Sequence, residues 1–181
     1  MKITDLALEG VKLLEPTYYE DNRGNGSEVY SHRTLSSNGI HNIFVQDYYN
    51  LNVQKGTLRG IHYQNYPYAQ AKIIRCLKGS ILDIVVDLRK NSPTYKKWIK
   101  TNISMENKKQ IFIPKGFGHG FVTLEEHTEA FYKMDEYYTP GFGGVILWND
   151  PELGIDWEID NPILSKKDIE APKLNNSSIN F

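Results

Sequence analysis

The stretch between Leu58 and Arg75 carries the residue types that acid–base chemistry on an anionic ligand requires. It reads LRGIHYQNYPYAQAKIIR and brings together Arg59, His62 and Lys72, with tyrosines between them. Arginine and lysine are cations that bind anionic groups, and histidine exchanges a proton near neutral pH. This mix suits a pocket for an anionic, ring-bearing ligand with one proton to move, although a strand pair with a solvated turn would also account for it.

A histidine that works as a base needs a partner, because a hydrogen-bonded carboxylate fixes the ring tautomer and stabilises the imidazolium. Several acidic residues are available, and spacing alone does not choose between them. One candidate is Asp168, which follows two lysines in the segment Leu164–Asp168. A helix capped by Ser165 with a charged first turn explains the same segment, and the sequence by itself favours that interpretation.

Two tyrosines and a second histidine are further candidates. If Ala130–Tyr138 forms a strand, alternation places Tyr132 and Tyr138 on one face. A phenol can donate a proton and its ring can stack on a nucleobase, while ordinary aromatic packing is the alternative. His119 lies in the glycine-rich segment Pro114–Gly120, which predicts a tight turn that presents a donor or is stabilised by the ring.

The histidines do not follow a metal-binding pattern. Metal-binding barrels of the cupin type place two histidines two residues apart on one strand, whereas His62 has no such neighbour. Motifs for nucleotide hydrolysis, serine hydrolysis and zincin chemistry are missing as well. We therefore expect neither a metal nor a cofactor.

Composition limits the class of protein. The chain has 181 residues, 40% of them hydrophobic, and a net charge of -1, which argues against a nucleic-acid or membrane-surface binder. Cys76 is the only cysteine, so a reducing compartment is expected. The segment Met1–Gly10 has no signal-peptide pattern, and no run of about 20 apolar residues exists. We expect a soluble cytoplasmic protein.

Many short strands separated by turn residues predict an all-β sandwich or barrel in one domain, residues 1–181. A hairpin is expected from Ile73–Leu77 and Ile81–Leu88, with Asp83 on a face that lines a polar cavity or meets solvent. His32–Ile40 is a weak helix candidate. The polar tail over 175–181 is expected to fray.

A series of short motifs, in a fixed order along residues 11–174, makes the sequence pattern specific for one family. They are Asp21-x-Arg23-Gly24-x-x-x-Glu28, Leu58-Arg59-Gly60-Ile61-His62-Tyr63-Gln64, Ala69-Gln70-Ala71-Lys72, Asp83-Ile84-Val85-Val86-Asp87-Leu88-Arg89, Ser92-Pro93-Thr94, Ile113-Pro114-x-Gly116-Phe117-x-His119-Gly120-Phe121, Tyr132-Lys133, Tyr137-Tyr138, Trp148-Asn149-Asp150-Pro151, Leu153-Gly154-Ile155 and Leu164-Ser165-x-Lys167-Asp168. With these motifs the chain resembles the dTDP-4-dehydrorhamnose 3,5-epimerase family, metal-free cupins that act on 4-keto nucleotide sugars.

The resemblance implies a cupin jelly-roll barrel with short peripheral helices, in a homodimer that exchanges N-terminal strands. It implies that His62 is the base, Asp168 its partner and Tyr132 the acid on the opposite face of the sugar. Lys72 and His119 would lie near the 4-keto oxygen. The remaining contacts to the nucleotide sugar would come from Arg23, Glu28, Gln46, Arg59, Lys167 and Tyr138, with Arg23 and Glu28 serving the other subunit's site and Tyr138 stacking near the nucleobase.

The implied chemistry is proton transfer next to a ketone. The C4 carbonyl acidifies the hydrogens on C3 and C5, His62 removes one of them, and Lys72 with neighbouring donors stabilises the enolate. Tyr132 returns a proton from the other face and so inverts the centre. This scheme uses no redox cofactor and no metal.

Three segments depart from the family pattern, and all three lie at ligand-contacting positions. Residues 25–27 read Asn-Gly-Ser where aromatic residues are usual, residues 48–52 replace an Asn-x-Ser-x-Ser pattern, and residues 141–144 lack a glutamate near Gly143. The reaction would thus be kept while the substrate differs. A GDP-4-keto-6-deoxy-heptose for capsule, epimerised at C3 or at C3 and C5, is the second candidate substrate. A 3,4-ketoisomerase and a non-catalytic sugar-binding cupin are the alternative functions.

Overall fold

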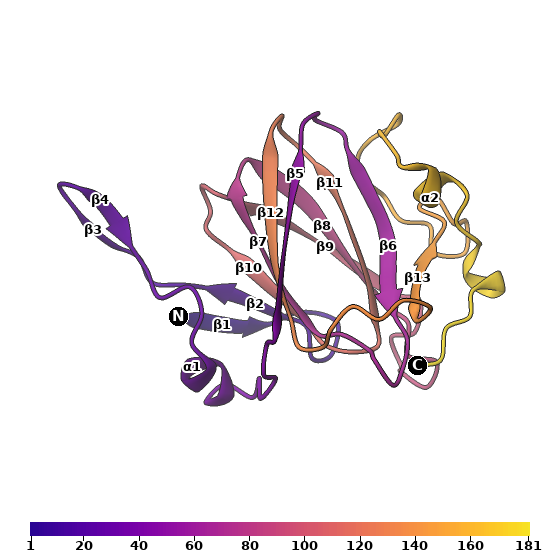
Figure 1. Ribbon diagram of the computed structural model, residues 1–181, viewed down its shortest axis with the longest axis horizontal. Coiled ribbons are helices and arrows are strands. Elements are labelled where there is room, and N and C mark those ends of the chain that lie inside the picture. Colours follow the sequence, from indigo (N-terminus) through magenta and orange to yellow (C-terminus); the bar gives the residue numbers. More distant parts are fainter.

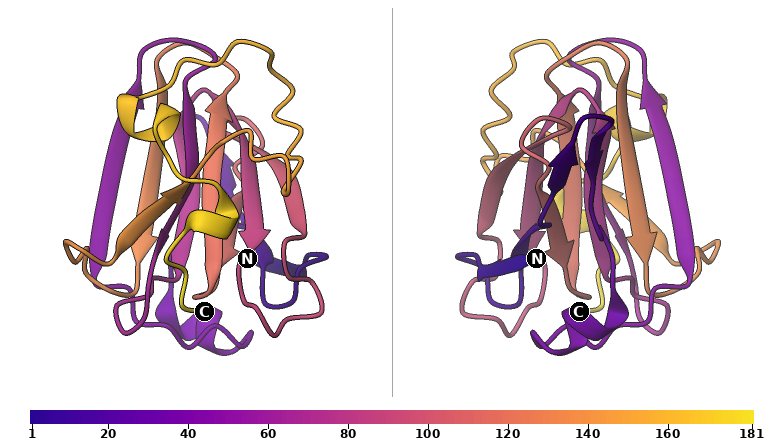
Figure 2. Two further views of the ribbon diagram at one scale, coloured as in Figure 1. Left: turned by 90° about the vertical axis from the view of Figure 1, so that its right-hand side faces the viewer. Right: turned by 90° about the vertical axis from the view of Figure 1, so that its left-hand side faces the viewer.

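Two antiparallel sheets face each other and form a jelly-roll barrel, as Figures 1 and 2 show for the computed structural model of residues 1–181. The six-stranded sheet has the order β1 (Lys2–Asp5), β2 (Lys12–Glu15), β10 (Gln110–Ile113), β7 (Lys72–Lys78), β12 (Thr128–Met134), β5 (Gln46–Asn52). The five-stranded sheet has the order β13 (Gly143–Ile146), β6 (Leu58–Gln64), β11 (Phe117–Thr123), β8 (Ser80–Asp87), β9 (Trp98–Ser104). The all-β prediction, with only short peripheral helices, is confirmed.

The predicted hairpin of β7 and β8 is wrong, because the two strands lie in different sheets. β7 pairs with β10 and β12, whereas β8 pairs with β9 and β11. Gly79 joins them with a φ of 68°, and a Cβ there would lie 2.4 Å from the hydroxyl of Thr128. Glycine is needed at this position because the backbone adopts a left-handed conformation against a packed neighbour, and the chain uses it to cross between sheets.

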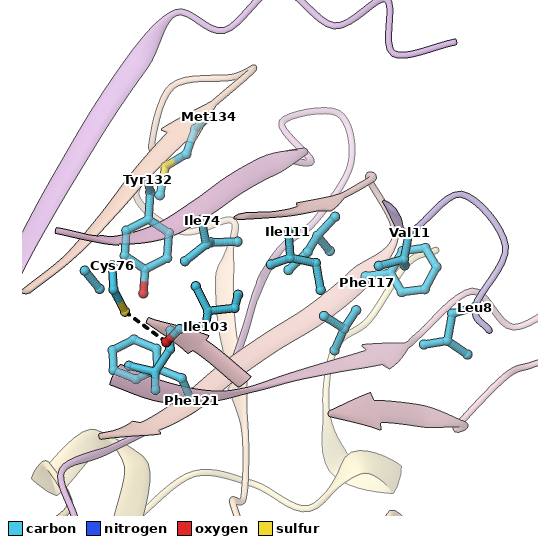
Figure 3. Close-up of a cluster of buried hydrophobic side chains, with 14 residues drawn as sticks. Leu8, Val11, Ile74, Cys76, Ile103, Ile111, Phe117, Phe121, Tyr132 and Met134 are labelled. Atoms are coloured by element: carbon cyan, nitrogen blue, oxygen red, sulfur yellow. Dashed lines mark hydrogen bonds between the residues drawn. The ribbon is translucent and has the colours of Figure 1, made fainter. Parts of the chain in front are cut away.

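Alternation along β8 separates two apolar layers. Leu82, Ile84 and Val86 point outward into one cluster, while Val85 joins the cluster between the sheets. That inner cluster also contains Tyr132, whose ring packs beside Ile74 in Figure 3. Every residue of β8 is buried, because the outer face of its sheet is covered as well as the inner one.

The cover over the outer face comes from the C-terminal segment, residues 147–181. It contains α2 (Lys166–Ile169) and η1 (Leu174–Asn176) and lies beside β6 and β13 in Figure 1. We expected its last residues to fray, but Ile179 is buried and the Phe181 ring packs against Tyr63 and Tyr66. Composition suggested a mobile tail because the apolar anchors are few and separated by polar residues.

The N-terminal region projects from the barrel. The hairpin of β3 (Tyr19–Asp21) and β4 (Gly24–Gly26) extends away from both sheets, with all its residues exposed (Figure 1). It is followed by α1 (His32–Ser36), which is capped by Ser31 and ends before the turn at Gly39, four residues short of the predicted end at Ile40. Neither this helix nor α2 is long enough to cross a membrane.

Two further expectations about local structure are wrong. Tyr138 does not continue the strand that carries Tyr132, because β12 ends at Met134 and Asp135 turns the chain by accepting a hydrogen bond from the Ala71 N–H at 2.6 Å. His119 lies inside β11 rather than in a turn, since the glycines around it sit where strands approach closely. A Cβ at Gly120 would lie 2.7 Å from the carbonyl oxygens of neighbouring β6.

Candidate active site

A cavity of about 530 Å³ opens between the two sheets. It collects most of the site residues that the sequence predicted. They are Gln46, Arg59, His62, Lys72, His119, Tyr132, Tyr138 and Lys167. The five-stranded sheet contributes Arg59, His62 and His119, and the six-stranded sheet contributes Gln46, Lys72 and Tyr132, so polar groups reach a bound molecule from opposite walls.

His62 on β6 is paired with Asp168 on α2. Its Nε2 lies 2.9 Å from Oδ1 of Asp168, and the same oxygen accepts the Gly60 N–H at 3.2 Å. Ser165 caps α2 and also donates its hydroxyl to Asp168 at 2.6 Å, so the cap and the contact between Asp168 and His62 occur together. Because Nε2–H faces the carboxylate, Nδ1 is left as the free, basic nitrogen.

The charge state of this pair suits a base. Burial lowers the pKa of His62, and it outweighs the opposing effect of Asp168, while the positive charges of Lys72 and Lys167 lower that pKa further. Burial acts to raise the pKa of Asp168, but hydrogen bonds from His62, Ser165 and Gly60 lower it overall. His62 is therefore neutral, and its partner ionised, at neutral pH.

A second histidine–aspartate pair lies beside the first. His119 is the cross-strand partner of His62, and its Nε2 lies 2.6 Å from Oδ2 of Asp83. Asp83 is fully buried, and its Oδ1 has no hydrogen-bond partner. Alternation predicted that Asp83 lines a polar cavity or meets solvent, but it does neither, because it lies fully buried behind His119, which lines the cavity.

Lys72 on β7 is a buried cation in the opposite wall. Burial lowers its pKa to about 8, and the negative charge of Asp83 limits the shift. A lysine that is mostly protonated at neutral pH and poorly solvated interacts strongly with developing negative charge, because water does not screen it.

Tyr132 is a buried phenol on β12, with its ring 5.9 Å from that of His119. Burial raises its pKa, while a side-chain hydrogen bond with Asn50 and the charge of Arg59 lower it. Tyr132 therefore carries its proton throughout the physiological range, as a general acid must.

Tyr138 is held over the cavity by three glutamines. Gln46 accepts the Tyr138 N–H at 2.8 Å, and Gln64 accepts the Thr139 N–H and donates to the Tyr137 carbonyl, both at 2.9 Å. The third, Gln70, donates to the carbonyl of Glu136 at 2.9 Å. The Tyr138 side chain itself is exposed at the mouth.

Three predicted site residues do not line the cavity: Asp168, which lies behind His62, and two residues of the N-terminal region. Arg23 sits on the projecting hairpin, where it pairs with Asp21 at 2.6 Å and its side chain is 83% exposed. The Glu28 carboxylate accepts a hydrogen bond from the Thr34 hydroxyl at 3.4 Å. A single chain does not bring either residue to the other site residues.

Some residues that shape the site were missed from the sequence. Asn50 and Asn52 are buried on β5, facing the cavity side, and Gln64 anchors the Tyr138 loop. The unusual tract 48–52 was the available signal for the two asparagines. No group of three or more His, Cys, Asp or Glu side chains is arranged to hold a metal ion.

Comparison with known proteins agrees with this geometry. The sequence profile of the family described as dTDP-4-dehydrorhamnose 3,5-epimerase matches residues 5–176. The enzyme of that name from Salmonella typhimurium is 44% identical over 176 residues, which cover 96% of each chain.

Solved structures show the same similarity. The dTDP-4-dehydrorhamnose 3,5-epimerase of Bacillus anthracis, with TDP and PPi bound, aligns with a TM-score of 0.93 and 44% identity over 95% of this chain and 98% of the other. The Legionella pneumophila enzyme, in complex with dTDP-4-keto-L-rhamnose, aligns with a TM-score of 0.92 and 39% identity over 97% and 93% of the two chains. The chain therefore belongs to the dTDP-4-dehydrorhamnose 3,5-epimerase family of isomerases.

Proposed function

We propose that this epimerase inverts C3 and C5 of dTDP-4-keto-6-deoxy-glucose, with His62 as base and Tyr132 as acid. The observation that carries the proposal is that these two groups reach one cavity from opposite sheets. Inversion requires removal of a proton from one face of a carbon and its return to the other. The Legionella relative binds the corresponding 4-keto-L-rhamnose nucleotide, which supports the choice of sugar.

Each inversion proceeds through an enolate. Nδ1 of His62 takes a proton from the carbon next to the C4 ketone, the C–H electron pair forms a double bond between that carbon and C4, and the carbonyl π pair moves to the C4 oxygen, which becomes negative. Lys72 and His119 stabilise that oxygen. Tyr132 then gives its proton to the opposite face, and the phenolate and the imidazolium return to their starting states by exchange with water.

Deuterium exchange tests the proposal directly. The protein is mixed with dTDP-4-keto-6-deoxy-glucose in deuterated water, and C3 and C5 are followed by NMR. We expect deuterium and inverted configuration at both carbons; exchange at C3 alone would make the enzyme a 3-epimerase. No deuterium at either carbon would contradict the proposal, and a carbonyl moved to C3 would identify a ketoisomerase.

The pH dependence of kcat/KM should report on Lys72 and His62. The lysine loses its positive charge as pH rises through about 8, so kcat/KM should fall above that pH. The histidine must be neutral and has a lowered pKa, so kcat/KM should fall on the acid side only below the ordinary histidine range near ~6.5.

Replacing Lys72 separates the alkaline limb of the pH profile of kcat/KM from its acid limb. Lys72→Arg keeps a cation that does not titrate in this range, so the alkaline limb should disappear while the acid limb stays in place. An alkaline limb that stays near pH 8 in this variant would assign it to another group.

The identity of the substrate's nucleobase has a second candidate. A guanine nucleotide is the second candidate because residues 141–144 lack a glutamate near Gly143, and residues 25–27 bring no aromatic ring. A thermal-shift series with dTDP, GDP, UDP and CDP distinguishes the bases, since a ligand that binds the native state raises the melting temperature. The largest shift is expected with dTDP; a larger one with GDP would favour the heptose substrate.

We also propose a homodimer in which each hairpin serves the partner's cavity. The isolated chain leaves Arg23 and Glu28 exposed and away from its own cavity. The outer face of the six-stranded sheet also exposes apolar side chains, among them Tyr49, Leu51 and Leu77. Pairing of two chains would cover this face and complete both sites.

Subunit complementation tests the exchange. Arg23→Ala and His62→Ala are each expected to be nearly inactive, but refolding them together should restore about a quarter of wild-type activity, because half of the dimers are mixed and each has one intact site. Activity that stays at the level of the separate variants would mean that Arg23 serves its own chain.

A further inference from the structure

Residues 178–181 are tied by hydrogen bonds to the turn that follows β6. Oδ1 of Asn180 accepts the Tyr66 N–H at 2.9 Å, and Nδ2 of Asn180 donates to the Tyr66 carbonyl at 3.0 Å. Nδ2 of Asn65 donates to the Ser178 carbonyl at 2.7 Å, and Oδ1 of Asn65 accepts the Asn180 N–H at 3.2 Å. These four bonds form a junction (the 65–180 junction) between two segments at least 113 residues apart, which meet near the end of β6 in Figure 1.

The turn in this junction also contacts the Tyr138 loop, residues 137–142. The Asn65 N–H donates to the Phe142 carbonyl at 2.9 Å, and the Asn65 carbonyl closes the turn by accepting the Tyr68 N–H at 3.0 Å. The rings of Tyr68 and Phe142 meet edge to face, with centroids 4.6 Å apart. Asn65 therefore links two segments, because its side chain binds residues 178–181 and its backbone binds the Tyr138 loop.

An aromatic contact accompanies the junction. The Phe181 ring lies edge-on to the Tyr66 ring, with centroids 5.6 Å apart, and to the Tyr63 ring, with centroids 6.1 Å apart. Tyr63 lines the cavity, and its ring occupies the space beside Gly144, where a Cβ would lie 2.2 Å from it. Residues 178–181 therefore reach the cavity wall by two paths, one through Tyr63 and one through the Tyr138 loop.

Tyr138 is the residue of its loop that can meet a ligand. It lines the cavity, and its ring lies beside Gly143, where a Cβ would be 3.5 Å from the nearest ring carbon. An aromatic ring at the mouth of a cavity offers a face on which a nucleobase can stack. Because 61% of the surface of Tyr138 is exposed, its own packing holds it weakly, and the backbone of the loop decides where the ring lies.

We infer that Asn65 and Asn180 are positioning residues that set the affinity for the nucleotide part of the substrate by holding the Tyr138 loop in place. The inference rests on the nucleotide-sugar substrate proposed above. When the junction is broken, the loop occupies several positions, and the apparent affinity falls with the fraction of molecules in which the ring is in place. The proton transfers of His62 and Tyr132 do not use this loop, so the chemical step should be kept.

Asn180→Leu tests the inference, because it removes both side-chain bonds to Tyr66 at an exposed position and keeps the size of the side chain. We expect the Kd for dTDP, measured by titration calorimetry, and the KM for the dTDP-sugar to rise about 3- to 10-fold, as for the loss of one or two hydrogen bonds. The value of kcat should change by less than about twofold. Asn65→Leu breaks the same junction from the other side and should raise Kd to a similar extent.

A double-variant cycle shows whether the effect passes through Tyr138. Tyr138→Ala alone should raise the Kd for dTDP by at least about fivefold, because it removes the stacking ring. Adding Asn180→Leu to Tyr138→Ala should raise Kd no further, since the ring that the junction positions is gone.

Asn175→Leu is the matched control. Asn175 lies in η1, a few residues before the junction, where it is exposed and does not line the cavity. This variant makes the same chemical change in the same part of the chain, so it should keep the wild-type Kd, KM and kcat.

Each opposing result has a distinct meaning. An unchanged Kd in Asn180→Leu, beside weakened binding in Tyr138→Ala, would overturn the role of the junction and leave the substrate proposal in place. A further rise of Kd in the double variant would mean that residues 178–181 act along the other path, through Tyr63. Wild-type affinity in Tyr138→Ala would overturn the inference, whereas failure of the wild-type protein to bind dTDP and invert the sugar would overturn the proposed function itself.

Discussion

Replacing His62 by alanine is expected to abolish deuterium exchange at C3 and C5 and to lower kcat by about 10²–10⁴-fold. The reason is that Nδ1 of His62 is the free nitrogen of the pair with Asp168, while the pKa of His62 is held low by burial. The measurement is NMR in deuterated water, with kcat from the appearance of inverted product.

The exposed His41 supplies the control, since His41→Ala changes a histidine that does not line the cavity. Binding of dTDP should be preserved in His62→Ala and is measured by thermal shift, which separates loss of the base from loss of the fold. Full exchange in a folded, ligand-binding His62→Ala protein would refute the assignment of the base.

Tyr132→Phe is expected to separate inversion from exchange. The variant loses one hydroxyl and keeps the ring that packs in the inner cluster, so His62 can still remove a proton and return deuterium to the same face. Inversion should fall about 10²-fold or more, while exchange at C3 persists. The ratio of exchanged to inverted substrate gives the result in a single NMR time course.

Tyr95→Phe is the matched change at a tyrosine that does not line the cavity, and it should leave both rates unchanged. A parallel fall of exchange and inversion in Tyr132→Phe would mean that the phenol acts before proton removal. In that case Tyr132 would orient the substrate rather than return the proton.

The residue types of the site could be predicted from the sequence, but several of its contacts could not. Alternation left open whether Asp83 lines a cavity or meets solvent, because its partner His119 belongs to a neighbouring strand 36 residues away and local pattern carries no signal for such pairing. His62 and Asp168 are 106 residues apart, and the sequence favoured a helix cap at Ser165. The Ser165 hydroxyl caps the helix and also donates to the Asp168 carboxylate that pairs with His62, so the two contacts are compatible.

The incorrect predictions about the fold also arise from contacts between residues that are distant in the chain. A glycine between two strand patterns predicts a hairpin, but at Gly79 the chain crosses between sheets, because β7 pairs with β10 and β12 while β8 pairs with β11 and β9. Tyr138 was placed on a strand because alternation continues in the sequence past Met134. The strand ends because Asp135 and three glutamines bind the backbone of this segment, and those contacts come from residues distant in the chain.

The position of Asp168 in the chain has a consequence for biosynthesis. The barrel strands end at Ile146, whereas the carboxylate that orients His62 arrives on the covering segment, which is anchored when Asp150 accepts the Leu174 N–H at 2.6 Å. During synthesis from the N-terminus, the strands that line the cavity can thus assemble before Asp168 reaches His62. A nascent chain that already binds nucleotide would lack the His62–Asp168 contact until residues 147–181 dock, so nucleotide binding and orientation of His62 would arise at different stages of folding.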